Sequence, residues 1–363
     1  PDSIKKLSTL GFDFSIETGA GDGASFSDEA LKEAGAEIVS NARAAILGSD
    51  LILKVRGPEA DAGDDMADYS SDKILIASLS ALGNKEQMDK LAATGVTAFA
   101  MELMPRITRA QSMDILSSQS NLAGYKAVLD AANELGRAYP MMMTAAGTIP
   151  PAKVFIMGVG VAGLQAIATA KRLGAVVTAT DVRPATKEQV ESLGGKFLEV
   201  DPKMEKDAQT EGGYAKEMPP EYFEKQKEVV SEHIKKQDVV ITTALIPGRP
   251  APILVTEEMV ASMPDGAVVV DLAVEAGGNC PLSEFGQTVK SHGVSIIGHA
   301  NVPSRIAEDA SQLFAKNLVN FITPLVDPET KSLNIDWEDE IIQGTLVCKD
   351  GKVVHPRLTD EGS

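Results

Sequence analysis

The sequence of 363 residues has few of the side chains from which disulfide frameworks and metal sites are built. It contains 2 cysteines, Cys280 and Cys348, and 4 scattered histidines. Two cysteines cannot form a disulfide framework or a structural zinc site, and the histidines do not have metal-ligand spacing. The composition therefore excludes a disulfide-stapled secreted scaffold and fits a reducing, cytoplasmic environment. We expect no bound metal.

Positive charge and long apolar runs are also scarce. Lys and Arg total 34 against 52 Asp and Glu, so the formal charge is −18. Such a surface repels phosphate backbones and anionic lipid head groups, which argues against nucleic-acid or membrane binding by the chain itself. The uncharged run 154–170 contains glycines and a glutamine, and it falls short of the about 18–20 apolar residues that span a membrane. No signal peptide follows the opening Pro-Asp-Ser-Ile-Lys-Lys.

The length and the pattern of the chain predict two α/β domains. A domain takes about 150 residues, which gives two or three domains here. Helical patterns alternate with β-rich runs over residues 4–102, and the same rhythm restarts at Pro150. This alternation is typical of βα units with helices on both faces of a parallel sheet. We predict two doubly wound Rossmann-like domains with parallel sheets, separated by a cleft.

Two long helical patterns set the domain boundaries. Residues 112–135 read as a helix that crosses to the second domain, and residues 305–321 read as a helix that returns. We place the first domain at 1–116 and 309–363, ending in a hairpin at Asp350-Gly351, and the NAD-binding Rossmann domain at 117–308. The expected strands are 12–17, 51–55, 74–79, 96–101, 153–157, 176–180, 239–243, 267–272 and 294–297.

The strongest motif is a glycine fingerprint, Gly158-Val159-Gly160-Val161-Ala162-Gly163. It follows an apolar run, opens a helical pattern, and lies 18 residues before an acidic residue, Asp181. This context is typical of dinucleotide binding. Gly158 permits the tight turn, Gly160 lets the backbone approach a pyrophosphate, and Gly163 allows close packing of the helix against the strand. The pyrophosphate then lies at the helix N-terminus. The alternative is a glycine-rich turn of an unrelated α/β protein.

Asp181 favours NAD over NADP. Its carboxylate would accept hydrogen bonds from the adenosine ribose and repel a 2′-phosphate. Arg183 could recruit such a phosphate, but we expect the acidic residue to dominate. A second glycine cluster, residues 19–23, has no helix start at the right distance, and we interpret it as a structural loop.

A second polar group lies in residues 106–117. Arg106 and Arg109 precede Gln111, Asp114 and Ser117, which are three residues apart and are expected to share one helical face. Two guanidinium groups, an amide, a carboxylate and a hydroxyl suit a nicotinamide carboxamide. A solvated helix face is the alternative, and the spacing alone favours it.

Two further segments have less specific interpretations. The charged stretch 201–221 contains Gly212-Gly213-Tyr214, and it is either a lid or a plain insertion; the paired glycines favour a hinge. The run Met141-Met142-Met143 predicts adaptable packing in a core or an interface.

Several long motifs resemble the NAD(H)-binding soluble component of proton-translocating nicotinamide nucleotide transhydrogenase. In bacterial three-subunit enzymes this component is the separate α1 subunit, and its architecture is related to that of alanine dehydrogenase. Members carry a longer N-terminus with an additional first strand, so we expect the present chain to be truncated there. The motifs are residues 101–125 (MELMPRITRAQSMDILSSQSNLAGY), 144–152 (TAAGTIPPA), 158–163 (GVGVAG), 213–218 (GYAKEM), 242–248 (TTALIPG) and 271–280 (DLAVEAGGNC).

The resemblance implies a role for each candidate residue. Four groups are implied, which position the nicotinamide and its ribose, meet the pyrophosphate, bind the adenosine end, and close around the nucleotide. In that order they are Arg106, Ile107, Thr108, Arg109, Gln111, Asp114 and Ser117; Gly158, Val159, Gly160, Val161 and Gly163; Asp181, Val182 and Arg183; and Gly213, Tyr214, Gln226, Ala244 and Leu245. We expect Arg106, Gln111, Asp114 and Ser117 to be the catalytic residues.

The same resemblance implies partners and a location. Family members are homodimers that dock on an NADP(H)-binding component, which is attached to a membrane subunit. NAD(H) is therefore expected on this chain and NADP(H) only on the partner. The protein would be cytoplasmic and peripheral to the inner membrane through its partner subunits.

Three functions compete. Hydride transfer between two nicotinamides moves no proton at the reacting atoms, so it needs positioning and exclusion of water but no acid or base. An alanine dehydrogenase must remove a proton; Lys54 stands where that family has a lysine, but Ser78 lies where a histidine is expected. A hydroxyl cannot replace imidazole as a base near pH 7. A non-catalytic NAD sensor would leave the polar nicotinamide site unexplained, so we favour transhydrogenase.

Overall fold

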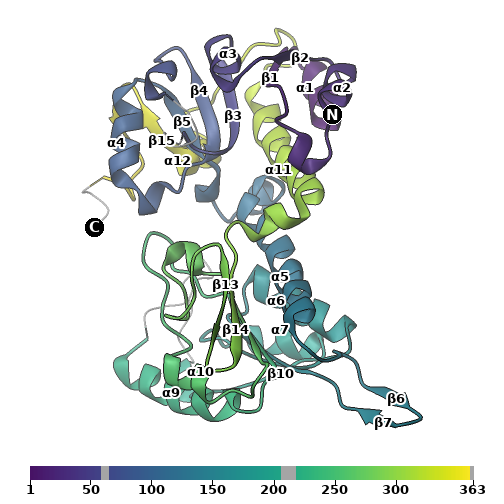
Figure 1. The fold of residues 1–363 in the computed structure, drawn as a ribbon. Coiled ribbons are helices and arrows are strands. Elements are labelled where there is room, and N and C mark those ends of the chain that lie inside the picture. The colour runs from purple at the N-terminus through teal and green to yellow at the C-terminus, as the bar shows by residue number, and fades with distance from the viewer. Residues whose placement is uncertain (59–64, 206–217, 360–363) are drawn as a thin grey trace. The chain divides into compact units, whose positions relative to one another are not determined.

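The computed structural model describes residues 1–58, 65–205 and 218–359. The chain forms two compact units: residues 1–119 with 306–363 make unit 1, and residues 120–305 make unit 2 (Figure 1). The chain passes from unit 1 to unit 2 within one long helix, α5 (Ile115–Glu134), and returns just before α11 (Ala307–Ile322). The two units are described separately below.

Unit 2 is a doubly wound α/β domain. Its seven-stranded sheet has the order β10-β9-β8-β11-β12-β14-β13, and all neighbours are parallel except the β13–β14 pair. The strand order reverses between β8 and β11, and at such a point ligands bind beyond the carboxyl ends of the strands. The strands are β8 (Lys153–Met157), β9 (Val176–Thr180), β10 (Lys196–Phe197), β11 (Val239–Thr242), β12 (Val268–Asp271), β13 (Gln287–Ser291) and β14 (Val294–Gly298). The helices are α6 (Val161–Arg172), α7 (Thr186–Ser192), α8 (Pro202–Glu205), α9 (Pro220–Ile234) and α10 (Glu257–Ala261).

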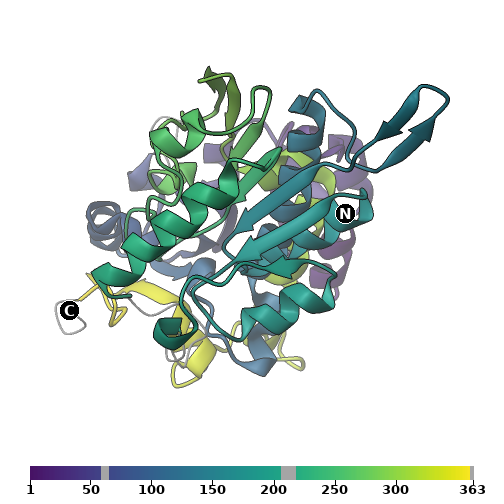
Figure 2. The same cartoon turned by 90° about the horizontal axis from the view of Figure 1, so that it is seen from below.

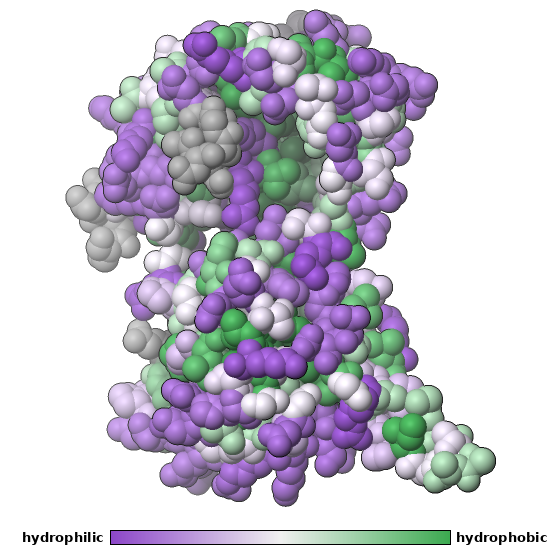
Figure 3. Space-filling view, viewed as in Figure 1, coloured by the Kyte–Doolittle hydropathy of each residue, from purple (hydrophilic) through white to green (hydrophobic). Residues whose placement is uncertain are grey.

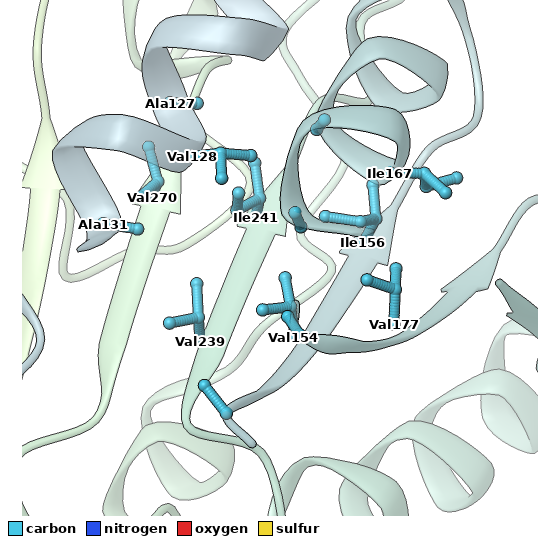
Figure 4. Packing of buried hydrophobic residues seen from close by; sticks show 14 of the residues in the cluster. Ala127, Val128, Ala131, Val154, Ile156, Ile167, Val177, Val239, Ile241 and Val270 are labelled. Atoms are coloured by element: carbon cyan, nitrogen blue, oxygen red, sulfur yellow. The ribbon is translucent and has the colours of Figure 1, made fainter. Parts of the chain in front are cut away.

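The central strands of unit 2 form because their residues are apolar on both sides. Successive strand side chains point to opposite faces, and β11 and β12 are buried throughout. One face packs against α5 and α6, as Figure 4 shows for Ile156, Ile241 and Val270. The other face carries Phe155 and Val240 against α9 and α10, and α9 crosses it in Figure 2. Both faces are therefore covered, as a parallel sheet requires.

Unit 1 is also α/β but less regular. A five-stranded sheet has the order β16-β15-β5-β4-β3, in which β3, β4 and β5 are parallel and β15 and β16 are antiparallel. Two more strands, β1 and β2, form a separate parallel pair. The strands are β1 (Phe14–Glu17), β2 (Ala36–Val39), β3 (Leu51–Arg56), β4 (Ile74–Ser78), β5 (Thr97–Ala100), β15 (Leu346–Lys349) and β16 (Lys352–Val353). The helices, besides α11, are α1 (Asp2–Ser8), α2 (Asp28–Glu33), α3 (Ala42–Leu47), α4 (Lys85–Ala93) and α12 (Glu340–Thr345).

Two local expectations need correction. The crossing helix begins at Ile115 rather than at residue 112, because residues 108–113 form a separate 3₁₀ helix. The methionine run is not in a core: Met141, Met142 and Met143 are 62%, 39% and 82% exposed. Met142 and Met143 lie on a hairpin, β6 (Met142–Thr144) with β7 (Gly147–Ile149), which extends away from unit 2 in Figures 1 and 2. Core packing was therefore the wrong interpretation, since nothing within unit 2 covers these side chains.

Two other findings concern the chain's ends and its helices. The hairpin expected at Asp350-Gly351 is confirmed, since these residues join β15 to β16. Across the ranges that the structure describes, no helix has the length and apolar character needed to cross a membrane.

Candidate nucleotide-binding site

The glycine fingerprint forms a tight turn between β8 and α6. Gly158 has φ +95°, a backbone conformation that L side chains rarely adopt. Its N–H donates to the Thr180 carbonyl at the end of β9 (3.0 Å), and the Thr243 N–H after β11 donates to the Met157 carbonyl (2.9 Å). A Cβ on Gly163 would lie 1.9 Å from the Gly158 carbonyl oxygen. Only glycine therefore lets α6 pack this closely against the turn.

The N-terminus of α6 is open to an anion. Gly160 is the N-cap residue, and no side chain caps the helix. The first N–H groups of a helix lack intrahelical acceptors and carry partial positive charge. The next residue, Val161, is 39% exposed, so the helix start is reachable from solvent. This end of the sheet therefore offers the chemistry that binds a diphosphate.

Asp181 is drawn to the glycine loop. It follows β9, and its Oδ2 accepts a hydrogen bond from the Val159 backbone N–H (2.7 Å). Its Oδ1 accepts from the Arg183 backbone N–H (2.9 Å), and the Arg183 guanidinium pairs with both oxygens through Nε and Nη2, each at 2.8 Å. The neighbouring Val182 is half-buried and packs against a small cluster around Tyr222. The acidic residue and the glycine loop thus form one structure.

The loop after β11 lies beside the glycine turn and is fixed by Asn279. The Thr243 hydroxyl donates to the Gly158 carbonyl (3.0 Å). The Asn279 side chain is fully buried; its Oδ1 accepts from the Ala244 N–H (3.1 Å), and its Nδ2 donates to the carbonyls of Ala244 (2.9 Å) and Pro252 (2.7 Å). Leu245 follows with its side chain 53% exposed. The sequence analysis did not single out Asn279, although it lies in the motif 271–280.

Three residues expected near the nucleotide lie on or before α9. Gln226 is half-buried on that helix. Gly213 and Tyr214 fall outside the described residues, and so does most of the predicted lid. The described residues on either side are joined, because the Tyr222 hydroxyl donates to Glu205 Oε1 (3.0 Å).

The polar segment 106–117 belongs to unit 1. It runs through a 3₁₀ helix, Thr108–Met113, and enters α5. Ile107 is half-buried and packs against the core. The side chains that remain exposed are those of Arg106, Thr108, Arg109 and Gln111.

The single helical face expected for Gln111, Asp114 and Ser117 is wrong. Asp114 is extended (ψ 100°) between the 3₁₀ helix and α5. Its carboxylate accepts from the Ser117 N–H (3.1 Å) and from the Ser117 hydroxyl, so it caps the start of α5. The structure therefore brings Asp114 and Ser117 together and places Gln111 on a separate helix.

Residues far away in sequence hold this segment in place. Asn317 and Asn320 of α11 both donate to the Ser112 carbonyl (2.9 and 3.0 Å), and Asn317 also accepts from the Ser118 hydroxyl (2.8 Å). The Arg109 guanidinium makes a two-point contact with Asp339, the N-cap of α12 (2.7 and 2.8 Å). None of these anchors has a signal in the local sequence.

The start of the segment is tied to the neighbouring strand. Glu102 follows β5, and its carboxylate accepts from the backbone N–H groups of Leu79 (3.0 Å) and Ala81 (2.9 Å) after β4. Burial raises the pKa of this carboxyl group above its ordinary value. The exits of two parallel strands are thereby joined beside the polar segment.

Metal and acid–base chemistry find little support in the described residues. No group of three or more His, Cys, Asp or Glu side chains within the three described ranges could hold a metal ion. The histidine of unit 1, His355, is buried; its Nε2 lies 3.2 Å from the Gly344 carbonyl, and its Nδ1 accepts from the Arg357 N–H (3.2 Å). Burial lowers its pKa. This ring is engaged by backbone rather than presented to a substrate.

Comparisons with known proteins agree with this architecture. Residues 1–123 match the family model described as alanine dehydrogenase/PNT, N-terminal domain, and residues 127–356 match the model of its C-terminal domain. The chain belongs to the alanine dehydrogenase/PNT family. This assignment confirms the expected resemblance, and nicotinamide nucleotide binding and an oxidoreductase role are in keeping with it.

Individual members of the alanine dehydrogenase/PNT family match almost the whole chain. An NAD(P) transhydrogenase subunit alpha protein of Rhodospirillum rubrum is 61% identical and covers 100% of this chain and 95% of that protein. An alanine dehydrogenase of Mycolicibacterium smegmatis is 30% identical over 98% of this chain and 90% of its own. The crystal structure of a transhydrogenase from Sinorhizobium meliloti has a TM-score of 0.83 at 52% identity, covering 98% of this chain and 93% of that one. The α/β fold of two Rossmann-like domains is thus confirmed.

Proposed function

We propose that the chain is the NAD(H)-binding component of a proton-translocating transhydrogenase. It passes a hydride between its bound NADH and NADP⁺ on a partner subunit, and the membrane subunit couples this transfer to proton translocation. One observation carries the proposal: a relative named as a transhydrogenase subunit is 61% identical across the entire chain. That similarity spans both the glycine loop and the polar segment 106–117.

The domain of residues 117–308 is proposed to hold the nucleotide. The tight turn at Gly158, the open N-terminus of α6 and the carboxylate at Asp181 fit a dinucleotide bound beyond the ends of β8 and β9. Bound NADH supplies the hydride. NADP(H) is assigned to the partner, because a 2′-phosphate would meet a carboxylate at Asp181.

The polar segment is proposed to orient the nicotinamide. The exposed side chains of Arg106 and Gln111 offer donors to a carboxamide, and Asp114 with Ser117 fixes the start of α5 beside them. A hydride passes directly only when donor and acceptor carbons approach to about 3–3.5 Å. No proton is exchanged at these carbons, so the residues need only to position the ring and exclude water.

A homodimer is part of the proposal, and the hairpin β6–β7 supports it. Residues 138–152 carry no charged side chain in a chain that is 24% charged. An isolated two-stranded hairpin is marginally stable in water, so this one needs a covering surface. Figure 3 shows hydrophobic residues gathered on this projection. A second copy of the chain would cover them, and sedimentation should then give twice the mass of one chain. The homodimer is proposed to be cytoplasmic and to reach the inner membrane through its partner subunits.

Reconstitution tests the whole proposal. The chain is mixed with the NADP(H)-binding component and the membrane subunit, and reduction of an NADP⁺ analogue by NADH is followed spectroscopically. Transfer that requires both proteins supports the proposal. Tight NADH binding without any transfer to the partner would contradict it.

An alanine dehydrogenase is the second candidate, because a member with that name is 30% identical over nearly the full chain. Lys54 lies on β3 and Ser78 ends β4. With no imidazole near Ser78, we expect no oxidation of L-alanine with NAD⁺. Turnover that Lys54→Ala abolishes would move the assignment to the amino-acid dehydrogenases.

A further inference from the structure

The Asp181 carboxylate has no spare acceptor position. A carboxylate offers about four lone-pair sites. At Asp181 these are filled by the backbone N–H groups of Val159 and Arg183 and by Nε and Nη2 of the Arg183 side chain. The side chain is only 7% exposed, so water does not compete strongly for it. A ribose can reach Asp181 only by displacing one of these donors.

The displaceable donors are those of the Arg183 guanidinium. The two backbone donors belong to the glycine loop and to the turn after β9, which the sheet holds in place. The Arg183 side chain is 18% exposed, and contact with Asp181 raises its pKa. Nε bonds one carboxylate oxygen and Nη2 the other, which is the pattern that a vicinal diol can reproduce with two hydroxyl groups.

We propose that Arg183 determines nucleotide specificity by competing with the adenosine ribose for Asp181. This inference rests on the proposed NAD(H) site. The ribose diol of NADH replaces both guanidinium donors, one on each oxygen. A ribose with a 2′-phosphate has a single hydroxyl there and brings negative charge to a carboxylate. The same ion pair keeps the Arg183 fork from that phosphate, which bidentate guanidinium contacts would otherwise bind.

The first test removes the competitor. In Arg183→Ala, Asp181 is open to the diol, so NADH should bind about 3–10-fold more tightly in a fluorescence titration, since one charge-assisted contact is no longer broken. NADPH should gain less. Lys187→Ala is the matched control: it removes the same charge from α7, where Lys187 pairs with Glu199 (2.8 Å) rather than with Asp181. It should change NADH affinity by less than about twofold.

The second test releases the competitor. Asp181→Asn keeps an acceptor for the Val159 N–H but no longer holds the guanidinium by charge. NADPH affinity should rise by about tenfold or more, and NADH affinity should fall by about tenfold. The double variant Asp181→Asn/Arg183→Ala should lose the NADPH gain, because the freed guanidinium is what binds the phosphate. Thermal melting of each variant verifies folding.

The outcomes separate this inference from the proposed function. If Arg183→Ala weakens NADH tenfold or more while Lys187→Ala does not, Arg183 is a direct nucleotide ligand and the competition is refuted. If NADPH affinity is the same in Asp181→Asn and in the double variant, Arg183 is not the latent phosphate site. A wild-type chain that binds neither NADH nor ADP-ribose would refute the proposed function itself.

Discussion

The glycine-loop site of unit 2 and the polar segment of unit 1 are built in opposite ways. In unit 2, the loop, the α6 start and Asp181 come from one β8–α6–β9 unit, and their contacts are largely backbone. In unit 1, the segment is held by side chains more than 200 positions away: Ser112 by Asn317 and Arg109 by Asp339, at separations of 205 and 230 residues. The first site is encoded locally and the second by tertiary structure.

This difference predicts how each site fails. A site made by close backbone approach is damaged when atoms are added, because closely packed elements cannot separate without strain. A site held by side-chain hydrogen bonds is damaged when atoms are deleted, because buried partners are left unsatisfied. The following variants test that distinction, in order of decreasing expected effect.

Adding one methyl group at Gly163 should have the largest effect. The new Cβ of Gly163→Ala would lie 1.9 Å from the Gly158 carbonyl, so α6 must move away from the turn. We expect NADH affinity to fall by about 100-fold or more and the free energy of unfolding by about 1–3 kcal/mol. Equilibrium denaturation and NADH fluorescence measure both.

Gly160→Ala is the matched control for folding. A Cβ at Gly160 meets nothing within 4 Å. Its free energy of unfolding should therefore stay within about 0.5 kcal/mol of the wild type, whatever happens to pyrophosphate binding. If both variants are equally stable, the close approach at Gly163 is not what fixes the loop.

The same distinction explains what the sequence could predict. The strands of unit 2 are apolar runs bounded by turn residues, and the glycine fingerprint with Asp181 is contiguous, so the sequence identifies them within a few residues. The edge strand β13 was missed because it is mostly exposed and carries polar residues such as Gln287 and Lys290. Asn317 and Asp339 could not have been identified as anchors, since their partners are known only once the chain has folded.

In unit 1, shortening Gln111 by one methylene should affect transfer more than binding. Gln111→Asn leaves the contacts of Asp181 and the glycine loop intact, so NADH affinity should stay within about tenfold. Hydride transfer to NADP⁺ on the partner should slow by about 100-fold, because small displacements of the ring destroy the reactive geometry. Near-normal transfer with collapsed affinity would make Gln111 a binding residue only.

Deleting the Asn317 side chain should loosen the segment from below. Asn317→Ala removes one donor to the Ser112 carbonyl and the acceptor of the Ser118 hydroxyl in a buried position. The free energy of unfolding should fall by about 1–3 kcal/mol, and hydride transfer should slow while binding of ADP-ribose is unchanged. Asn320→Ala is the control, because Asn320 is exposed and makes one bond to the same carbonyl. A loss of ADP-ribose binding in Asn317→Ala would break the comparison, since the two sites would then not be independent.

The smallest effect is expected at the exposed ion pair between Arg109 and Asp339. Asn is also a good N-cap residue, so Asp339→Asn retains the cap of α12 and removes only the charge. Arg109 lowers the pKa of Asp339 below the ordinary value of 3.8. A lowered pKa in the folded state means that the stabilisation is present above that ordinary value and is lost as the pH falls through the folded-state pKa. The Tm of Asp339→Asn should therefore lie slightly below that of the wild type at pH 7, by less than in Asn317→Ala, and the gap should close in acid. Because the pair is exposed, salt should narrow the gap as well. A Tm difference that persists unchanged at low pH and high salt would show that Asp339 holds the segment through its cap on α12 rather than through Arg109.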